Sequence, residues 1–443
     1  MAGRATPAPP LQLAEGIDLI GEFEGSGYKE PHYIARRADG QVIQLSELLY
    51  RTADNVDGSR GYKAIADEVS QEFGRRVSEG NVQFLIEKKL RPLGVVKGAD
   101  GSEPDVKKLD PFLALKFRTA VVPDWLTKTF TTIFKPLFWP PVIIAAVIAL
   151  GALDYWLFAV HGIAQGARTM LYEPTFLLAV FGLVVVSAAF HEIGHATAVR
   201  YGGAKPGVMG VGIYLVWPAF YTDVTDAYRL GRGGRLRTDL GGIYFNGIFS
   251  LVTFGAYFLT GWEPLLFVIV LQHMEVLHQL LPFLRLDGYY IIADLTGVPD
   301  MFARIKPILK SAMPFSRTDD SVKELKPWVR MVVTLWVLAL IPILLYVFGI
   351  MIISAPRLMA TAWDSLVVQW GKTSTAFGDG QYAGVAAGGL QMGALSLPIA
   401  GMVASFGRLG KKITGSMWKR TDGRPIARGS FVIVALGLLA AVA

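Results

Sequence analysis

Long apolar runs dominate this chain beyond about residue 136. Six runs are long enough to cross a bilayer as helices, because about 20 apolar residues span its hydrocarbon core. A further run at 431–443 is too short to count as a span by itself. We therefore expect a mainly α-helical polytopic membrane protein with about six to seven transmembrane helices. The six runs are 137–160, 174–198, 240–260, 264–284, 327–353 and 382–406.

Before residue 136, the pattern is typical of a small soluble α+β domain. Residues 33–45 alternate as a hairpin would, and Ser46 can cap a helix that follows. Helical periodicity then covers residues 61–73 and resumes after Ser78. The divisions that we expect are a disordered segment at 1–27, a winged-helix-like domain at 28–97, a linker and membrane-surface segment at 98–135, a membrane-embedded core at 136–310 and a C-terminal transmembrane region at 311–443.

The composition agrees with a membrane protein, because 52% of the residues are hydrophobic and only 18% are charged. The net charge of +7 could suggest a nucleic-acid partner, but the positive residues concentrate beside the apolar runs, as membrane orientation demands. We therefore expect a lipid bilayer and no nucleic acid. If the N-terminal domain is cytoplasmic, three basic loops fall on its side, which favours a bacterial cytoplasmic membrane protein of that orientation. The chain lacks cysteine, so any metal ligands must be His, Asp or Glu.

The second apolar run ends in Phe190-His191-Glu192-Ile193-Gly194-His195-Ala196. On a helix, His191 and His195 lie one turn apart on one face, where both imidazoles can bind one metal ion. Glu192 stands beside them and can take a proton from water. Two structural histidines on a packed helix are the alternative, but ionisable residues in apolar spans are costly and usually functional. The motif thus predicts a zinc site with Glu192 as the general base.

Catalytic zinc normally has three protein ligands, so one ligand remains to be found. If the fourth run is helical throughout, it brings Asp287, in Leu286-Asp287-Gly288, to the same side and a similar depth as His191. Asp287 is therefore the first candidate. The competing candidates are His273, Glu275, His278, Asp223 and Asp226.

The fourth run also carries a polar stripe, because Gln272, Glu275 and Gln279 share a helical face and His278 lies beside it. The stripe can face the active site, or it can join helices by hydrogen bonds without a catalytic part. Asp154 in the first run is equally ambiguous and has no identifiable partner.

The His191–His195 motif and Leu286-Asp287-Gly288 together resemble the site-2 protease family of intramembrane zinc metalloproteases. The longer stretch from Leu281 to Tyr290 is similar to its peptide zinc metalloprotease branch. The resemblance covers about residues 137–310 and implies that His191, His195 and Asp287 bind zinc while Glu192 is the general base. It also implies a place near the catalytic centre for Asn246, whose alternative role is helix packing. Gln279 departs from the branch, which usually has Asn there.

Two segments are candidates for holding substrate. Residues 208–216 alternate as a strand could, and this segment can pair with an extended substrate while Trp217 and Tyr221 seat it in the membrane interface. A re-entrant packing loop is the alternative. Residues 28–97 resemble in pattern the winged-helix peptide-recognition domains that accompany enzymes processing ribosomally made peptides, and a generic winged-helix domain is the alternative.

The expected function is hydrolysis of a peptide bond near the cytoplasmic interface. The substrate is a precursor peptide, for instance one that loses its leader, or a membrane-anchored protein. A non-catalytic membrane protein that binds or transports peptides is the alternative. A histidine-box oxidase is disfavoured, because the six histidines of the chain do not form the several boxes that a di-iron centre needs. The sequence does not indicate an oligomeric state.

Overall fold

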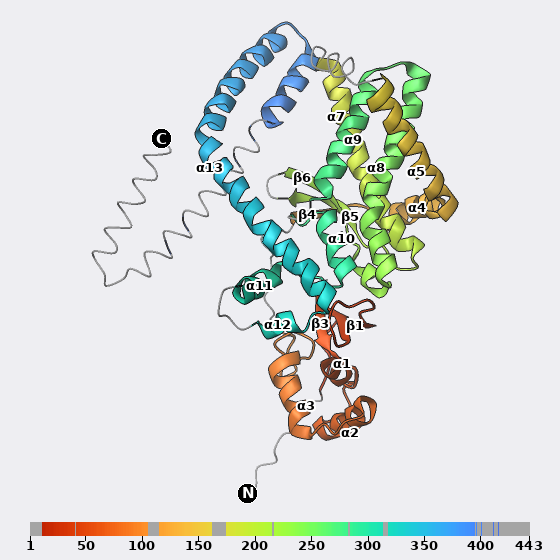
Figure 1. The fold of residues 1–443 in the computed structure, drawn as a ribbon, viewed down its shortest axis with the longest axis vertical. Helices are drawn as coiled ribbons and strands as arrows, with labels where there is room; N and C mark the ends of the chain where they lie inside the picture. Colours follow the sequence, from red (N-terminus) through yellow and green to blue (C-terminus); the bar gives the residue numbers. More distant parts are fainter. Residues whose placement is uncertain are drawn as a thin grey trace, which may run out of the picture.

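The computed structural model describes residues 11–39, 41–104, 115–161, 174–214, 217–281, 284–312 and 318–394, and the single residues 396, 400, 411 and 415. Figure 1 shows a small α+β unit at the N-terminal end of the molecule and a group of long helices at the other end. Helix α13 (Pro327–Gly378) begins beside the small unit and runs along the side of the helical group.

The N-terminal unit is a three-stranded antiparallel sheet covered by helices. Its strands β1 (Asp18–Glu22), β2 (His32–Arg36) and β3 (Val42–Ser46) pair in the order β1-β2-β3. Helices α1 (Glu47–Asp54), α2 (Tyr62–Phe73) and α3 (Glu79–Leu85) follow, and α3 continues into a π-helical turn at Ile86–Leu90. Apolar residues of these helices and strands form one core, with Leu45, Ile65, Val69, Val82 and Ile86 fully buried.

The predicted hairpin and the two predicted helix caps of this unit are confirmed. Strands β2 and β3 form the expected hairpin. Ser46 accepts a hydrogen bond from the backbone N–H of Leu49, and Ser78 accepts one from Asn81, so both serines cap their helices. The expectation of disorder over 1–27 is wrong for its second half, because β1 lies there and Phe23 is buried. The Ala- and Pro-rich composition that suggested disorder is confined to residues 1–10, which lie outside the described residues.

The expected linker at 98–135 contains regular structure instead. Strand β4 (Lys116–Val122) pairs with β5 (Met209–Tyr214), which pairs with β6 (Trp217–Thr222) in a second antiparallel sheet. Helix α4 (Asp124–Phe134) and a 3-10 turn at Lys135–Phe138 then lead to the first apolar run. The charged composition hid β4, because its partner strand is about 90 residues away in sequence and local patterns do not record such pairing.

Four helices of the described chain are long and apolar enough to cross a membrane, which supports a membrane protein. These spans are Pro140–His161, Leu178–Tyr201, Arg232–Thr260 and Pro327–Tyr346. They belong to α5 (Pro140–Tyr155) with the π-helical turn η3 (Trp156–His161), to α7 (Pro174–Tyr201), to α8 (Arg232–Thr260) and to α13. The expected six to seven spans are not established by these four.

The remaining apolar runs differ from expectation or lie partly outside the described residues. Helix α9 (Pro264–Gln279) is shorter than the run at 264–284, and it ends three residues before a proline that disfavours its continuation. Residues 382–394 are helical, whereas most of 395–406 and all of 431–443 lie outside the described residues. The other elements are the 3-10 turns η4 (Thr225–Arg229) and η5 (Phe302–Arg304), and the helices α10 (Asp287–Thr296), α11 (Ile305–Ala312) and α12 (Asp320–Lys323).

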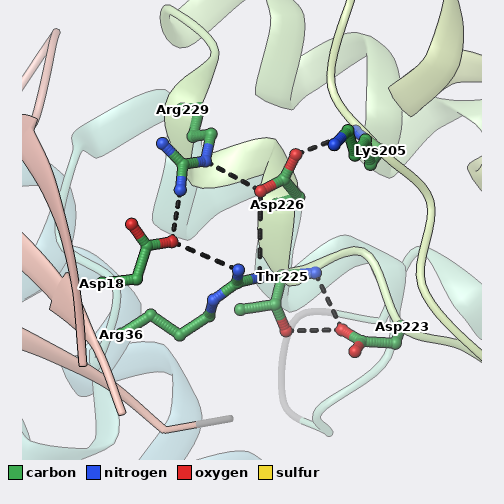
Figure 2. A network of polar contacts seen from close by, with 7 residues as sticks. All are labelled: Asp18, Arg36, Lys205, Asp223, Thr225, Asp226 and Arg229. Atoms are coloured by element: carbon green, nitrogen blue, oxygen red, sulfur yellow. Dashed lines mark hydrogen bonds and ion pairs between the residues drawn. The ribbon is translucent and has the colours of Figure 1, made fainter. Parts of the chain in front are cut away.

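Charged side chains tie the N-terminal sheet to the segment that follows β6, as Figure 2 shows. Asp18 of β1 pairs with Arg36 of β2 at 3.2 Å and also with Arg229 of η4. Arg229 in turn donates to Asp226 at 2.8 Å, and the backbone N–H of Lys205 donates to the second oxygen of Asp226 at 2.8 Å. The network thus joins two strands of the small unit to the base of the β5–β6 hairpin.

The loop between β1 and β2 provides a second contact between the two parts. The backbone N–H of Gly27 donates to the carbonyl of Gly297 at 3.0 Å, and the N–H of Lys326 donates to the carbonyl of Gly27 at 2.9 Å. Tyr28 is buried in a core cluster with residues of α10 and α13 such as Tyr289 and Val329. The N-terminal unit is therefore packed against the helical part rather than tethered to it.

Candidate metal centre

The two motif histidines lie on the buried face of α7, in its last three turns. His191 is 5% exposed and His195 is 8% exposed. Their Nε2 atoms are 3.0 Å apart, as the one-turn spacing predicts. The two Nε2 atoms therefore converge on one point, where both could bind the same metal ion.

Asp287 reaches the same place as the first residue of α10. Its Oδ2 atom is 3.2 Å from Nε2 of His191 and 3.4 Å from Nε2 of His195. The expected route was wrong, because the helix is not continuous from α9 and Asp287 follows a break in it. Burial by itself raises the pKa of Asp287, but the adjacent imidazoles outweigh burial and hold this pKa well below its usual value. We call His191, His195 and Asp287 the His-His-Asp cluster.

The His-His-Asp cluster fits a zinc ion. A tetrahedral ion with ligand bonds of about 2.0–2.2 Å needs its ligand atoms roughly 3.3 Å apart, and the three separations here are 3.0, 3.2 and 3.4 Å. Nδ1 of His195 lies 2.7 Å from the carbonyl oxygen of Thr238, which can only accept, so Nδ1 carries the proton and Nε2 is free to bind. Oδ2 of Asp287 is buried without a hydrogen bond among the described residues.

Gly242 of α8 leaves the space that an ion would need. A methyl group on this residue would lie 2.4 Å from Nε2 of His191 and 2.5 Å from Nε2 of His195. Sequence reasoning missed Gly242 and Thr238. The small-residue pair Gly241-Gly242 was the available signal for close approach of another helix.

Glu192 follows the first histidine and is partly buried. Its backbone carbonyl accepts a hydrogen bond from Oγ1 of Thr222 at 3.0 Å, which joins α7 to the end of β6. The residue proposed as the base is therefore anchored beside the second sheet.

Asn246 lies one turn after Gly242 on α8 and is 1% exposed. Its Nδ2 atom is buried and has no hydrogen-bond partner among the described residues. An unpartnered buried amide is costly in a structure that serves packing alone. The place of Asn246 one turn from Gly242 favours a role toward a bound group.

The polar stripe of α9 divides into two parts. Gln272 is buried and accepts a hydrogen bond from Ser187 of α7 at 2.5 Å, which is the interhelical role considered as an alternative. Glu275 and His278 are about half exposed, with Glu275 bonded to Gln279 at 2.9 Å and 4.0 Å from His278. This second part lies outside the His-His-Asp cluster.

The other candidates for third ligand have different partners. His273 pairs with Asp154 at 2.9 Å, so the structure supplies the partner that Asp154 lacked in the sequence. Asp223 accepts hydrogen bonds from Thr225, and Asp226 belongs to the charged network of Figure 2.

Strand β5 is confirmed, but it cannot accept a substrate strand, because β4 and β6 occupy both of its edges. The outer edge of β6 is unpaired among the described strands. Tyr221 lies on β6 opposite Gly210 and is partly buried, whereas the side chain of Trp217 lies outside the described residues. Among the described strands, the outer edges of this sheet are therefore those of β4 and β6.

A curated protein of Bacillus subtilis (strain 168), named "Putative peptide zinc metalloprotease protein YydH", is 24% identical to this chain over 144 residues. The match covers 32% of this chain and 57% of that protein's length. No known family profile matches the chain, and no solved structure matches it. The similarity gives weak support to a zinc metalloprotease and agrees with the His-His-Asp cluster.

Proposed function

We propose that this protein is a membrane-embedded zinc metalloendopeptidase of the site-2 protease type. The observation that carries the proposal is the His-His-Asp cluster, whose three donor atoms lie 3.0–3.4 Å apart beside Glu192. Two imidazoles, one carboxylate and an adjacent glutamate on a helix are the groups that metal-assisted hydrolysis requires. The similarity to YydH, whose name describes a putative peptide zinc metalloprotease, supports the zinc metalloprotease part of this proposal.

The chain's own residues supply the proton transfers and the positioning. Zinc, when bound, would polarise a water molecule and the scissile carbonyl. Glu192 accepts the proton of the attacking water and later returns it to the leaving amine. Asn246 lies one turn after Gly242 on α8, and its unpartnered Nδ2–H can donate to the carbonyl of a substrate bound beside the His-His-Asp cluster.

We place an extended substrate along the outer edge of β6. Backbone groups at this edge are unpaired among the described strands and can form hydrogen bonds with an added strand. Thr222 at the end of β6 contacts the carbonyl of Glu192 at 3.0 Å, so a peptide on this edge would run toward the proposed base. An extended peptide also exposes the amide that a helix encloses.

The proposed substrate is a precursor peptide recruited by the N-terminal unit, and a membrane-anchored protein is the second choice. The outer edge of β3 is unpaired among the described strands, which supports addition of an extended peptide there. The basic loops beside the spans support a cytoplasmic position for this unit and for the cluster.

Mass spectrometry of peptides from cells with the wild-type protein and with Glu192→Gln tests this proposal. A peptide that is cleaved only in wild-type cells is expected. The same cleavage products in both cells would contradict the proposed base. If the peptides from the two kinds of cell do not differ, but a purified candidate peptide binds to the purified protein, the protein is a binding or transport protein. Iron in place of zinc in purified protein would favour an oxidase instead.

A further inference from the structure

Arg235 of α8 is a buried cation that the proposed hydrolysis does not use. Its side chain is 1% exposed. Nε donates to Oδ1 of Asp294 at 2.9 Å, while Nη1 and Nη2 donate to the carbonyls of Leu230 and Glu24 at 2.8 and 2.9 Å. A buried charge whose nitrogens are all bonded is held in one geometry, because the loss of any partner leaves a polar group unpaired.

The bond between Arg235 and Asp294 joins the two helices that flank the metal centre. Arg235 lies three residues before Thr238, whose carbonyl fixes Nδ1 of His195 at 2.7 Å. Asp294 lies seven residues after Asp287 on α10, which is about two turns and therefore the same face. The bond thus links the helix that orients one ligand to the helix that carries another.

Asp239 provides a second contact between α8 and α10. It lies one turn after Arg235, and its carboxyl group interacts electrostatically with that of Asp294. Burial raises the pKa of Asp294, although Arg235 opposes the rise. An amide at position 294 could accept from Arg235 and donate to Asp239, whereas a methyl group could do neither.

The N-terminal unit completes the surroundings of Arg235. The guanidinium carbon lies 4.1 Å from the centre of the Phe23 ring, and this ring is 1% exposed. The carbonyl of Glu24 accepts from Nη2, and the carbonyl of Gly25 accepts from Arg232 at 2.7 Å. The loop after β1 therefore covers the cation that connects α8 and α10.

We propose that Arg235 and Asp294 are positioning residues of the metal centre, and that the N-terminal unit holds them in place through Phe23 and Glu24. This inference rests on the proposed function, because it requires zinc at the His-His-Asp cluster. Displacement of the N-terminal unit would then loosen α10 and weaken metal binding. By reciprocity, metal binding would strengthen docking of the unit.

Metal binding by the purified full-length protein tests the proposal. The zinc dissociation constant is measured by competition with a chelator, and the absorption spectrum of the Co²⁺-loaded protein reports the ligand geometry. Asp294→Ala should weaken zinc binding by about 10–100-fold and alter the cobalt spectrum, as loss of outer partners of a metal site does. Asp294→Asn should stay within about threefold of wild type, because its amide oxygen can still accept the hydrogen bond from Arg235.

A second pair of variants separates the N-terminal contribution. Phe23→Leu keeps an apolar side chain and removes the ring face, so it should weaken zinc binding by up to about tenfold. Phe84→Leu is the matched control, because Phe84 lies on α3 of the same unit and is 55% exposed. It should leave the zinc constant unchanged.

The outcomes are distinct. Wild-type affinity and spectrum in Asp294→Ala would overturn the positioning role. If that variant does not fold, Arg235→Lys replaces it, since Lys lacks the planar fork, and an unchanged spectrum there would overturn the same claim. Equal constants for Phe23→Leu and Phe84→Leu would overturn the role of the N-terminal unit. If wild type binds no zinc, or His191→Ala binds it equally well, the proposed function itself fails.

Discussion

Gly242 and His191 lie so close that a methyl group on Gly242 would be 2.4 Å from Nε2 of His191. This distance is far inside van der Waals contact, so any other residue at 242 would displace the imidazole or fill the space between the donor atoms. Helix α8 therefore contributes to the metal centre in two ways. Gly242 has no side chain to fill the space between the donor atoms, and the Thr238 carbonyl one turn earlier bonds to His195.

Gly242→Ala should remove most of the zinc from the purified protein, because the added methyl group collides with both histidine rings. Gly255→Ala on the same helix is the matched control, since a methyl group there meets nothing within 4 Å. We expect zinc binding to be at least about tenfold weaker in Gly242→Ala. Zinc binding should be unchanged in Gly255→Ala. Equal zinc content in the two proteins would show that the space beside Gly242 is not the metal site.

Glu192→Gln should keep zinc and lose cleavage, because the amide cannot accept the proton of the attacking water. Removal of a general base lowers the rate by roughly 10²–10⁴-fold. Glu275→Gln is the control carboxylate, since Glu275 is about half exposed and lies outside the cluster. Undiminished cleavage by Glu192→Gln, with substrate and zinc present, would rule out Glu192 as the base.

Gly27→Ala should destabilise the packing between the N-terminal unit and the helices. A methyl group there would lie 2.2 Å from the carbonyl oxygen of Thr296 and 3.0 Å from Val298. Overpacking of this kind costs about 1–3 kcal/mol, which should appear as a lower thermal midpoint. Gly80→Ala on α3, with nothing within 4 Å of its added methyl, should cost far less. Equal midpoints would mean that the loop is not packed as described.

Local features of this chain were predictable because local chemistry determines them. The spacing of His191 and His195 on one helix face, and the capping by Ser46 and Ser78, need only residues within one turn. The place of Asp287 near the histidines was also anticipated, although its route was not.

Contacts between distant segments could not be read from the sequence. Strand β4 looked like a linker because its partner β5 lies far along the chain. Asp154 and His273 are separated by 119 residues, and Arg235 and Asp294 by 59, so neither pair leaves a periodic signal. Backbone partners such as the Thr238 carbonyl cannot be predicted from residue type, because every residue carries a backbone carbonyl.

The central claim is that His191, His195 and Asp287 bind one zinc ion. The most direct test is the zinc content of the purified full-length protein and of Asp287→Ala, with His278→Ala as the control for the competing ligand. The proposed site predicts about one zinc per chain in wild type and in His278→Ala, and much less in Asp287→Ala. Unchanged zinc in Asp287→Ala, or its loss in His278→Ala, would contradict the proposed centre.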